Sequence, residues 1–414
     1  MAKQSRTTAI PLLRFPEFRD AKGWTLRNGE DLFDAINNRW VSDELPILAI
    51  TQEHGAIPRD QIDYHVSVTD KSIESYKVVE KGDFIISLRS FQGGIEYSTY
   101  KGICSPAYVI LRRKTEDCDV YFRHLFKSFR FIQQLTRNIE GLRDGKMISY
   151  KQFSEQLIPV PDSLEQQKIA DCLTSLDDVI AAQRSKVEAL KTYKRDLMQQ
   201  LFPREGELVP RLRYPEFRDG LEWKETRLGA LGGLVAGLTY SPDDVRDSGL
   251  LVLRSSNVQN AEITLEDCVY VTPDIKGANL AKPDDILICV RNGSKTLIGK
   301  SALIPEGMPT CTHGAFMTVF RARAPHFVFQ LMQSVAFQKQ VAADLGATIN
   351  SINGSQLLRY RFAVPEPDEQ RRIAECLSSL SARITAEAKK LVSLKIHKKG
   401  LLQRLFPVVD EVAA

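Results

Sequence analysis

The chain has 414 residues, enough for about two to four domains, and its 43% hydrophobic and 26% charged residues are typical of a globular protein with a buried core. It has no apolar run of about 18 residues and no apolar signal segment at its start, which predicts a cytoplasmic protein without a membrane span. The seven cysteines show no C-x-x-C spacing, which argues against a zinc site. The net charge of +4 is too small to indicate that the chain binds nucleic acid unaided.

The elements follow one another in a repeated order along the chain. Residues 1–164 contain apolar runs such as FIISL and YVILRR, separated by Gly, Pro, Asn and Asp, which predicts an α+β domain rich in short strands. Residues 165–203 carry apolar side chains at alternating four- and three-residue spacing, which predicts one long helix able to form a coiled coil. Residues 204–368 and 369–407 repeat this order of domain and helix, and residues 408–414 form a tail.

The two halves also repeat each other in their letters. RFPEFRD begins at residue 14 and RYPEFRD at residue 213, 199 positions later (213 − 14), and Trp24 and Trp223 follow them at the same offset. GDFIISLR matches DDILICVR, MISYKQF matches SINGSQL, EQQKIADCLTSL matches EQRRIAECLSSL, and MQQLFP matches LQRLFP. Such a series indicates duplication of a unit of about 200 residues. The predicted fold is therefore α+β, with two similar mixed α/β domains separated by two long helices that form an antiparallel coiled coil, in a pseudo-twofold internal repeat.

The antiparallel direction follows from the connectivity. The second domain lies between the end of the first helix and the start of the second, and the termini of a domain usually lie close together. About 38 residues at 1.5 Å per residue give a rod of roughly 57 Å with one domain near each end. Polar seam positions often fix register, so Lys194 is expected opposite Glu387 and Gln183 opposite Lys398. The predicted seam residues are Ile169, Leu173, Leu176, Ile180, Lys194, Leu197, Leu201, Ile373, Leu377, Leu380, Ile384, Glu387, Leu401 and Leu405.

Two similar modules at a fixed separation suit a ligand with two separated sites, such as duplex DNA of about 15 base pairs. Arg pairs with guanine and Asn or Gln with adenine in the major groove, whereas Lys more often neutralises phosphate. Arg89 and Arg291 are the leading candidates because they end equivalent apolar runs. The candidate DNA contacts are Gln52, Arg89, Ser90, Gln92, Lys101, Arg143, Lys146 and Ser149 in the first half, and Asn257, Arg291, Asn292, Ser294, Lys295, Lys300, His313, Asn350 and Asn353 in the second.

The sequence predicts no catalytic residue and no metal site in this chain. GSKTLIGKS at 293–301 is similar to a phosphate-binding loop, but five residues instead of four separate its two glycines. The following SALIPEG predicts a strand and a turn, so the loop is better interpreted as the turn of a hairpin. The characteristic segments of a methyltransferase are missing, and the six histidines have no ligand spacing.

The chain resembles the specificity subunits of type I restriction-modification enzymes over nearly its whole length. The resemblance lies in the duplicated PEFRD…W segment, in KMISYKQFSEQLIPVP leading into EQQKIADCLTSLDDVI, and in LMQQLFP and LLQRLFP. It implies two target recognition domains, each reading half of a bipartite, asymmetric site in double-stranded DNA. It also implies that the helices bind two modification subunits, which methylate adenine at N6, and that restriction subunits join to translocate and cleave DNA. S-adenosylmethionine, ATP and Mg would then belong to the partner subunits, with no cofactor in this chain.

Three other functions stay open at this point. One is a DNA-reading subunit of a related methylation-based defence system without the usual nuclease. Another is a structural coiled-coil adaptor, which would show no preference among DNA sequences. The third is a self-sufficient enzyme, which would methylate DNA when S-adenosylmethionine is added to the chain alone.

Overall fold

The structure is a computed structural model that describes residues 8–39, 45–62, 75–137, 148–345 and 350–409. The chain divides into two compact units. Unit 1 comprises Met1–Arg184 and Lys389–Ala414, and unit 2 comprises Ser185–Ala388. The boundaries fall inside the two long helices, so each unit contains one globular domain together with a segment of both helices.

The central sheet of unit 1 is antiparallel and buried on both faces. FIISL and YVILRR form neighbouring strands, in which Leu111 pairs with Phe84 and Ile110 with Ile85. Because side chains alternate across a strand, Phe84 and Leu111 enter the aromatic core, whereas Ile85 and Ile110 enter a smaller core on the other face. The strand order is β3 (Phe33–Ile36), β10 (Val109–Arg113), β7 (Phe84–Ile86) and β8 (Glu96–Tyr97).

Short sheets and helices complete unit 1 around a cluster of phenylalanine rings. The ring of Phe33 meets those of Phe84 and Phe122 edge-on, at centroid distances of 5.5 and 5.1 Å. The other sheets are β1 (Thr8–Ala9), β2 (Trp24–Asn28) and β11 (Leu157–Val160), then β4 (Leu48–Thr51) with β5 (Gly55–Pro58), and β6 (Lys77–Val79) with β9 (Gly102–Cys104). Among the described residues of unit 1, the short α-helices are α1 (Gly29–Leu32), α3 (Ser90–Gly93), α4 (Asp119–Leu125), α5 (Phe129–Thr136) and α6 (Tyr150–Ser154).

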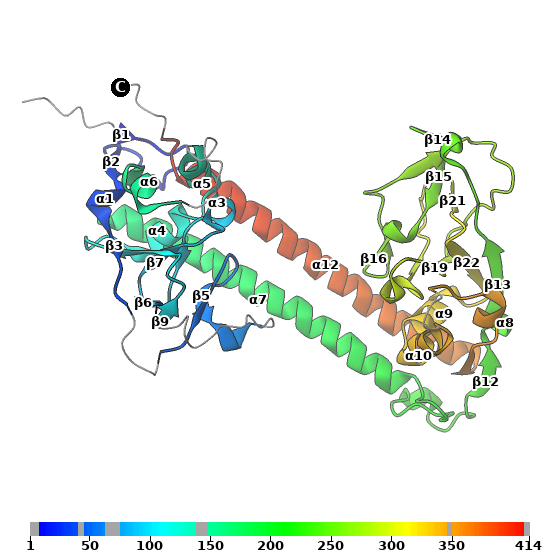
Figure 1. Cartoon of the computed structure of the whole chain (residues 1–414). Coiled ribbons are helices and arrows are strands. Elements are labelled where there is room, and N and C mark those ends of the chain that lie inside the picture. The colour runs from blue at the N-terminus through cyan, green and yellow to red at the C-terminus, as the bar shows by residue number, and fades with distance from the viewer. Residues whose placement is uncertain (1–7, 40–44, 63–74, 138–147, 346–349, 410–414) are drawn as a thin grey trace, which may run out of the picture. The chain divides into compact units, whose positions relative to one another are not determined.

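Unit 2 repeats the central sheet with the same strand order, so the duplication extends to the topology. Figure 1 labels three strands of this second sheet, β13, β22 and β19. This sheet is β13 (Gly232–Ala236), β22 (Met317–Ala322), β19 (Ile286–Cys289) and β20 (Ser301–Leu303). The other strands are β12 (Lys224–Arg227) with β23 (Arg361–Val364), the sheet β14 (Val245–Arg246), β18 (Val269–Val271), β15 (Leu250–Leu253) and β21 (Cys311–His313), and β16 (Val258–Gln259) with β17 (Glu262–Ile263). The short helices are α8 (Leu228–Leu231), α9 (Pro325–Met332), α10 (Val335–Asp344) and α11 (Gly354–Leu357).

The two long helices are α7 (Ser163–Leu201) and α12 (Pro367–Leu405), each of 39 residues. Both begin and end two residues earlier than predicted. At the start of α7, the Asp162 side chain accepts a hydrogen bond from the Glu165 backbone N–H (3.0 Å) and caps the first turn. At the start of α12, Pro367 is tolerated because the first helical residues have no intrahelical acceptor for their N–H groups.

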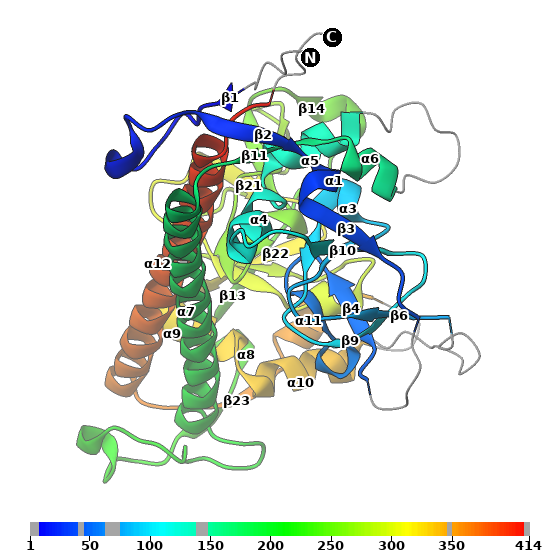
Figure 2. The same cartoon turned by 90° about the vertical axis from the view of Figure 1, so that its left-hand side faces the viewer.

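Within each unit the two helices run antiparallel. In unit 1, Ile169 and Leu173 near the start of α7 share the aromatic core with Leu405 at the end of α12. Figure 2 shows these two helix ends beside β2 and β11. In unit 2, Leu201 at the end of α7 shares a core with Ile373 near the start of α12. The predicted antiparallel coiled coil between two similar α+β domains is thus confirmed.

The predicted register of this coiled coil is wrong by about two helical turns. In unit 2, Glu387 forms an ion pair with Lys186 (2.5 Å) and not with Lys194, which lies eight residues further along α7 (194 − 186). Burying one large apolar side chain stabilises a fold by about 1.5–3 kcal/mol, whereas a partly exposed ion pair contributes about 1 kcal/mol or less. The apolar helix ends that enter the domain cores therefore decide the register.

Unit 1 shows a similar shift. Lys398 pairs with Asp177, six residues before its predicted neighbour Gln183. The predicted seam positions nevertheless face inwards along both helices. Those that are buried are Ile169, Leu173, Ile180, Leu201, Ile373, Leu377 and Leu405, and those that are half-buried are Leu176, Lys194, Leu197, Leu380, Ile384, Glu387 and Leu401.

Candidate nucleic-acid interface

The repeated RFPEFRD segment attaches each domain to the first turn of the helix that follows it. In unit 1, the Arg14 guanidinium donates two hydrogen bonds to the Glu165 carboxylate (2.7 and 2.6 Å), and the Trp24 indole donates a third (3.0 Å). Arg14 also donates to the backbone carbonyls of Ala21 and Lys22 (2.7 and 3.0 Å). The Glu165 side chain is only 1% exposed, so this is a buried, charge-assisted contact. We call it the Arg–Glu–Trp clasp.

Unit 2 contains the same clasp. Arg213 donates two hydrogen bonds of 2.8 Å to Glu369, and the Trp223 indole donates one of 3.2 Å. Each carboxylate lies in the first turn of a long helix, where the helix dipole favours negative charge. The sequence revealed the repeat but not this role. The available signal was that both the Arg–Trp pair and the glutamate that opens each heptad run occur twice.

A second duplicated ion pair holds the strands that carry the leading candidates. Arg112 on β10 donates two hydrogen bonds to Asp83, just before β7 (2.8 and 2.7 Å). Arg321 on β22 donates two to Asp285, just before β19, at the same distances. Bidentate pairing of this kind fixes orientation as well as distance. The ends of β7 and β19 are therefore held in equivalent positions in the two units.

Arg89 and Arg291 follow these two strands, and both side chains are exposed. No carboxylate among the residues that the structure describes forms an ion pair with either guanidinium. A guanidinium without an internal counter-charge is well suited to a phosphate or to the O6 and N7 atoms of guanine. These two arginines are thus the best-placed candidates for contacts with nucleic acid.

In unit 2 several predicted contacts come together around Arg291. The Asn350 side chain donates a hydrogen bond to the Gly293 carbonyl (2.9 Å), and the Asn292 side chain donates one to the Ser255 hydroxyl (3.0 Å). Three separate segments are thereby tied into one polar surface. We call it the Arg291 patch; it comprises Ser255, Arg291, Asn292, Gly293, Ser294, Lys295, Phe316 and Asn350.

The GSKTLIGKS segment within this region is a hairpin loop, as predicted. It connects β19 and β20, which pair antiparallel. A single 3₁₀ turn, Lys295–Leu297, takes the place of the helix that a phosphate-binding loop requires. Lys300 is half-buried, and its carbonyl accepts the Cys289 backbone N–H (2.9 Å).

In unit 1 the structure brings Gln52, Arg89 and Gln92 together. Arg89 precedes α3, Gln92 is exposed on that helix, and the Gln52 side chain covers Gly93, where an added Cβ would lie 2.6 Å from it. Lys101 is exposed on a different turn and pairs with Glu80 (2.9 Å).

An ion pair with a buried carboxylate supports the turn that carries Gln52. Lys127 donates a hydrogen bond to the Gln52 carbonyl (3.3 Å) and also pairs with Glu96, which is 2% exposed. Burial raises the pKa of the Glu96 carboxyl and lowers the pKa of the Lys127 amine, while their mutual attraction opposes both shifts. The Lys127–Glu96 pair therefore fixes the position of this turn through the contact of Lys127 with the Gln52 carbonyl.

Two predicted contacts are wrong because their side chains are buried and hydrogen-bonded within the fold. Ser90 is 1% exposed, and its hydroxyl accepts the Ser87 backbone N–H (2.8 Å). Asn257 is 0% exposed and donates to the carbonyls of Thr264 and Asp267 (3.0 Å each). Both positions are polar in sequence because they satisfy loop backbone groups.

The prediction for His313 is also wrong. Its ring is 0% exposed, and Nε2 lies 3.0 Å from the Val235 carbonyl, to which it donates. Burial lowers the pKa of this imidazole, which therefore stays neutral near pH 7.

The remaining candidates lie at helix starts or outside the described residues. The side chains of Ser149 and Asn353 accept backbone N–H groups in the first turns of α6 and α11, at 3.2 and 3.0 Å, so they act as caps. Arg143 and Lys146 lie outside the described residues. Their predicted contacts stay predictions.

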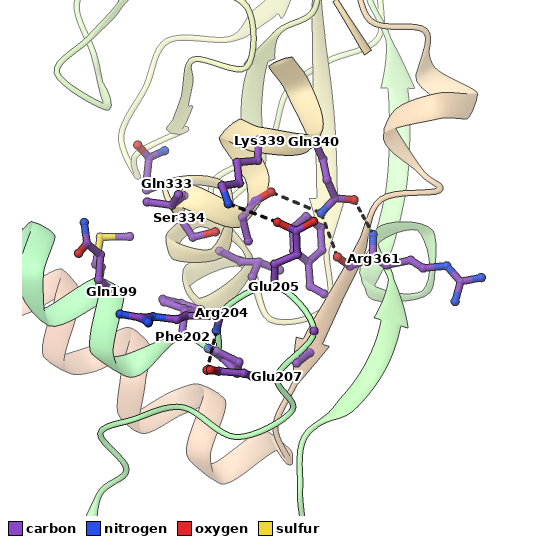
Figure 3. A pocket seen from close by; sticks show the side chains of 18 of the residues that line it. Gln199, Phe202, Arg204, Glu205, Glu207, Gln333, Ser334, Lys339, Gln340 and Arg361 are labelled. Carbon is purple, nitrogen blue, oxygen red and sulfur yellow. Dashed lines mark hydrogen bonds and ion pairs between the residues drawn. The ribbon is translucent and has the colours of Figure 1, made fainter. Parts of the chain in front are cut away.

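A hollow of about 1240 Å³ lies in unit 2 beside the end of α7 and the start of α10. Some of the polar residues that line it pair with one another, as Figure 3 shows. Lys339 pairs with Glu205 (3.3 Å), and the Gln340 side chain bonds the backbone N–H and carbonyl of Arg361 (3.0 and 2.9 Å). Among the described residues there is no group of three or more His, Cys, Asp or Glu side chains placed to hold a metal ion. Within the same ranges, no helix has the length and apolar character needed to cross a membrane.

The duplicated domains, the antiparallel helices and the exposed arginines define a two-module recognition scaffold. The family model for the type I restriction modification DNA specificity domain matches residues 21–192 and again residues 221–395. The chain therefore belongs to this family, and the resemblance noted in the sequence is confirmed.

Curated relatives differ in how much of their length the chain matches. The specificity subunit of the type I restriction enzyme MjaVIII from Methanocaldococcus jannaschii is 24% identical over 353 residues, covering 82% of this chain and 81% of that protein. The StySPI specificity subunit from Salmonella potsdam is 27% identical over 179 residues, and the match spans 41% of this chain and 38% of that protein. The EcoKI specificity subunit from Escherichia coli is 28% identical over 172 residues, or 39% of this chain and 37% of that protein.

Solved structures share the fold at low sequence identity. The S subunit of a type I restriction-modification system from M. genitalium aligns with a TM-score of 0.58 and 15% identity, covering 97% of this chain and 100% of that chain. A chain from a structural study of assembly and conformational transition in a type I R-M system aligns with the same TM-score and 19% identity, covering 93% and 98%.

Proposed function

We propose that this protein is the DNA specificity subunit of a type I restriction-modification system and is itself non-catalytic. The observation that carries the proposal is the presence of two copies of the specificity domain in one chain, at residues 21–192 and 221–395. Each unit also has its own central sheet, its own Arg–Glu–Trp clasp and its own exposed arginine, Arg89 after β7 or Arg291 after β19. Two such modules suit the two halves of a bipartite DNA site.

The asymmetry of the site follows from differences between the modules. The Arg–Glu–Trp clasps and the sheets are alike, but the Arg291 patch of unit 2 has no counterpart in sequence around Arg89. Each domain would therefore read a different half-site. The paired helices, about 58 Å each at 1.5 Å per residue, would set the spacing over about 17 base pairs of DNA.

The partner proteins would be two modification subunits bound along the helices, and restriction subunits that join the complex. S-adenosylmethionine, ATP and Mg would be bound by these partners. Together they would methylate adenine, translocate DNA and cleave it. The low net charge of this chain, +4, agrees with partners that supply further phosphate contacts.

The test is selection from a randomised DNA pool by the complex of this chain with its modification subunits. A bipartite consensus with a fixed spacer is expected. Replacing residues 204–368 with the matching domain of a relative should change one half-site and leave the other half-site and the spacer unchanged. A structural adaptor would select no consensus, and methyl transfer by the chain alone would identify a self-sufficient enzyme.

The spacing role has its own test. Inserting one heptad at facing positions of α7 and α12 keeps the seam in phase and adds about 10 Å, or about three base pairs of rise. The same half-sites should then be selected with a longer spacer. Binding is expected to weaken because three base pairs also rotate one half-site by about a third of a turn. An unchanged spacer would contradict the proposal.

A further inference from the structure

The Arg291 patch contains an aromatic ring that is exposed to solvent. Phe316 lies in the turn between β21 and β22, and it is 58% exposed. Its backbone carbonyl accepts the N–H groups of Val290 and Arg291, both at 3.1 Å, so the turn is tied to the end of β19. The backbone of this residue therefore has a structural role, whereas the ring projects towards solvent.

The ring and the Arg291 side chain form one unit. The guanidinium carbon lies 5.6 Å from the centre of the Phe316 ring, within the range of a cation–π contact. Such a contact restricts the long arginine side chain while leaving its N–H donors free. Hydrogen-bond donors of Asn292 and Asn350 are already used within the patch, at 3.0 and 2.9 Å, so the patch is held in shape before any ligand binds.

The first domain has no aromatic residue at the position equivalent to Phe316, although the strands correspond. Arg321 on β22 and Arg112 on β10 bind equivalent aspartates and are therefore equivalent residues. The residues five positions before these two arginines are then equivalent as well. These residues are Phe316 in unit 2 and Ala107 in unit 1, and Ala107 is also exposed. The aromatic ring is thus a feature of one half only, as expected for a residue that reads sequence and not for one that maintains the common fold.

We propose that Arg291 and Phe316 together read one step of the second half-site in the major groove. Phe316 contacts the C5-methyl group of a thymine, and Arg291 donates two hydrogen bonds to O6 and N7 of the guanine next to it. Both are contacts that these side chains make with base edges. The separation of 5.6 Å places the two groups within reach of adjacent bases, which stack about 3.4 Å apart. This inference rests on the proposed function.

The test removes one methyl group at a time from the DNA. Each thymine of the half-site that depends on residues 204–368 is replaced by deoxyuridine, and binding by the complex with modification subunits is measured. For the wild-type chain, one substitution should weaken binding about fourfold, the value for one buried methyl group. For F316A that substitution should have no effect, whereas F316L, which keeps an apolar side chain, should retain part of it. F129A is the matched control, since Phe129 is a 52% exposed phenylalanine in unit 1.

The arginine is tested with R291Q. Glutamine pairs with adenine, so the variant should lose tenfold or more in its preference for guanine over adenine at the neighbouring base pair. If F316A shows the same deoxyuridine penalty as the wild type, or if no thymine gives a penalty, this inference is wrong while the proposed function stands. If the wild-type complex shows no sequence preference, the proposed function itself fails.

Discussion

The clasp in unit 1 allows a quantitative prediction from a single substitution, Glu165→Gln. The carboxylate accepts three hydrogen bonds, two from Arg14 and one from Trp24. One carboxylate oxygen, Oε2, accepts from both the Trp24 indole and an Arg14 NH2 group, and a glutamine oxygen can take its place. The glutamine NH2 group then faces the Nε–H of Arg14, and two donors meet. The substitution leaves a buried arginine, 8% exposed, without its counter-charge. Removing one partner of a buried ion pair costs about 3–5 kcal/mol, and we expect about 3 kcal/mol because the shape is conserved.

Urea unfolding of the full chain, followed by hydrogen-exchange mass spectrometry, measures this loss in each unit separately. This readout avoids assuming that two units unfold in one step. E165Q should lower the free energy of unfolding for unit 1 peptides, and E369Q should do the same for unit 2. The control is E17Q, whose carboxylate is 45% exposed and pairs with Lys168 at 2.9 Å; its expected loss is much smaller, because an ion pair in contact with water contributes little to stability. Equal effects of E165Q and E17Q would refute the reasoning.

Three further predictions concern pH, backbone conformation and salt. Burial lowers the pKa of His124 to about 4, whereas a histidine in the unfolded chain has a pKa near 6.5. The unfolded chain therefore binds more protons than the folded chain between these two values. As the pH falls from 6.5 to 4, unit 1 should lose up to about 1.4 kcal/mol of stability per pH unit. H124Q should flatten this slope in acid unfolding curves, with H326Q at an exposed histidine as the control. Gly94 has φ +82°, and a Cβ added there would lie 2.1 Å from the Phe126 carbonyl oxygen. Gly277 is the control, because its φ is +84° but no atom lies within 4 Å of an added Cβ. G94A should therefore lower the melting temperature by several degrees more than G277A. The isolated chain should bind DNA weakly with a shallow dependence on salt, whereas the complex with modification subunits should show a steeper slope, and equal slopes in a salt titration would contradict this.

The sequence by itself determined the features that depend on local pattern. The heptad runs became two helices of 39 residues, and the apolar runs FIISL and YVILRR became paired strands buried on both faces. The duplication was visible in letters because the same contacts, such as the Arg–Glu–Trp clasp, constrain both halves. Periodicity and repetition are properties of the local sequence and do not depend on which distant residues pack against it.

Only the tertiary structure decided what depends on distant neighbours. Whether a polar loop residue is exposed like Arg291 or buried like Asn257 is set by segments that pack over it, and the two look alike in sequence. The register of the helices was set by apolar ends buried in the domain cores, because their burial outweighs the polar pairs in between. Likewise, Arg291 meets Phe316 only because the end of β19 is bonded to the turn before β22, a contact between segments 25 residues apart (316 − 291).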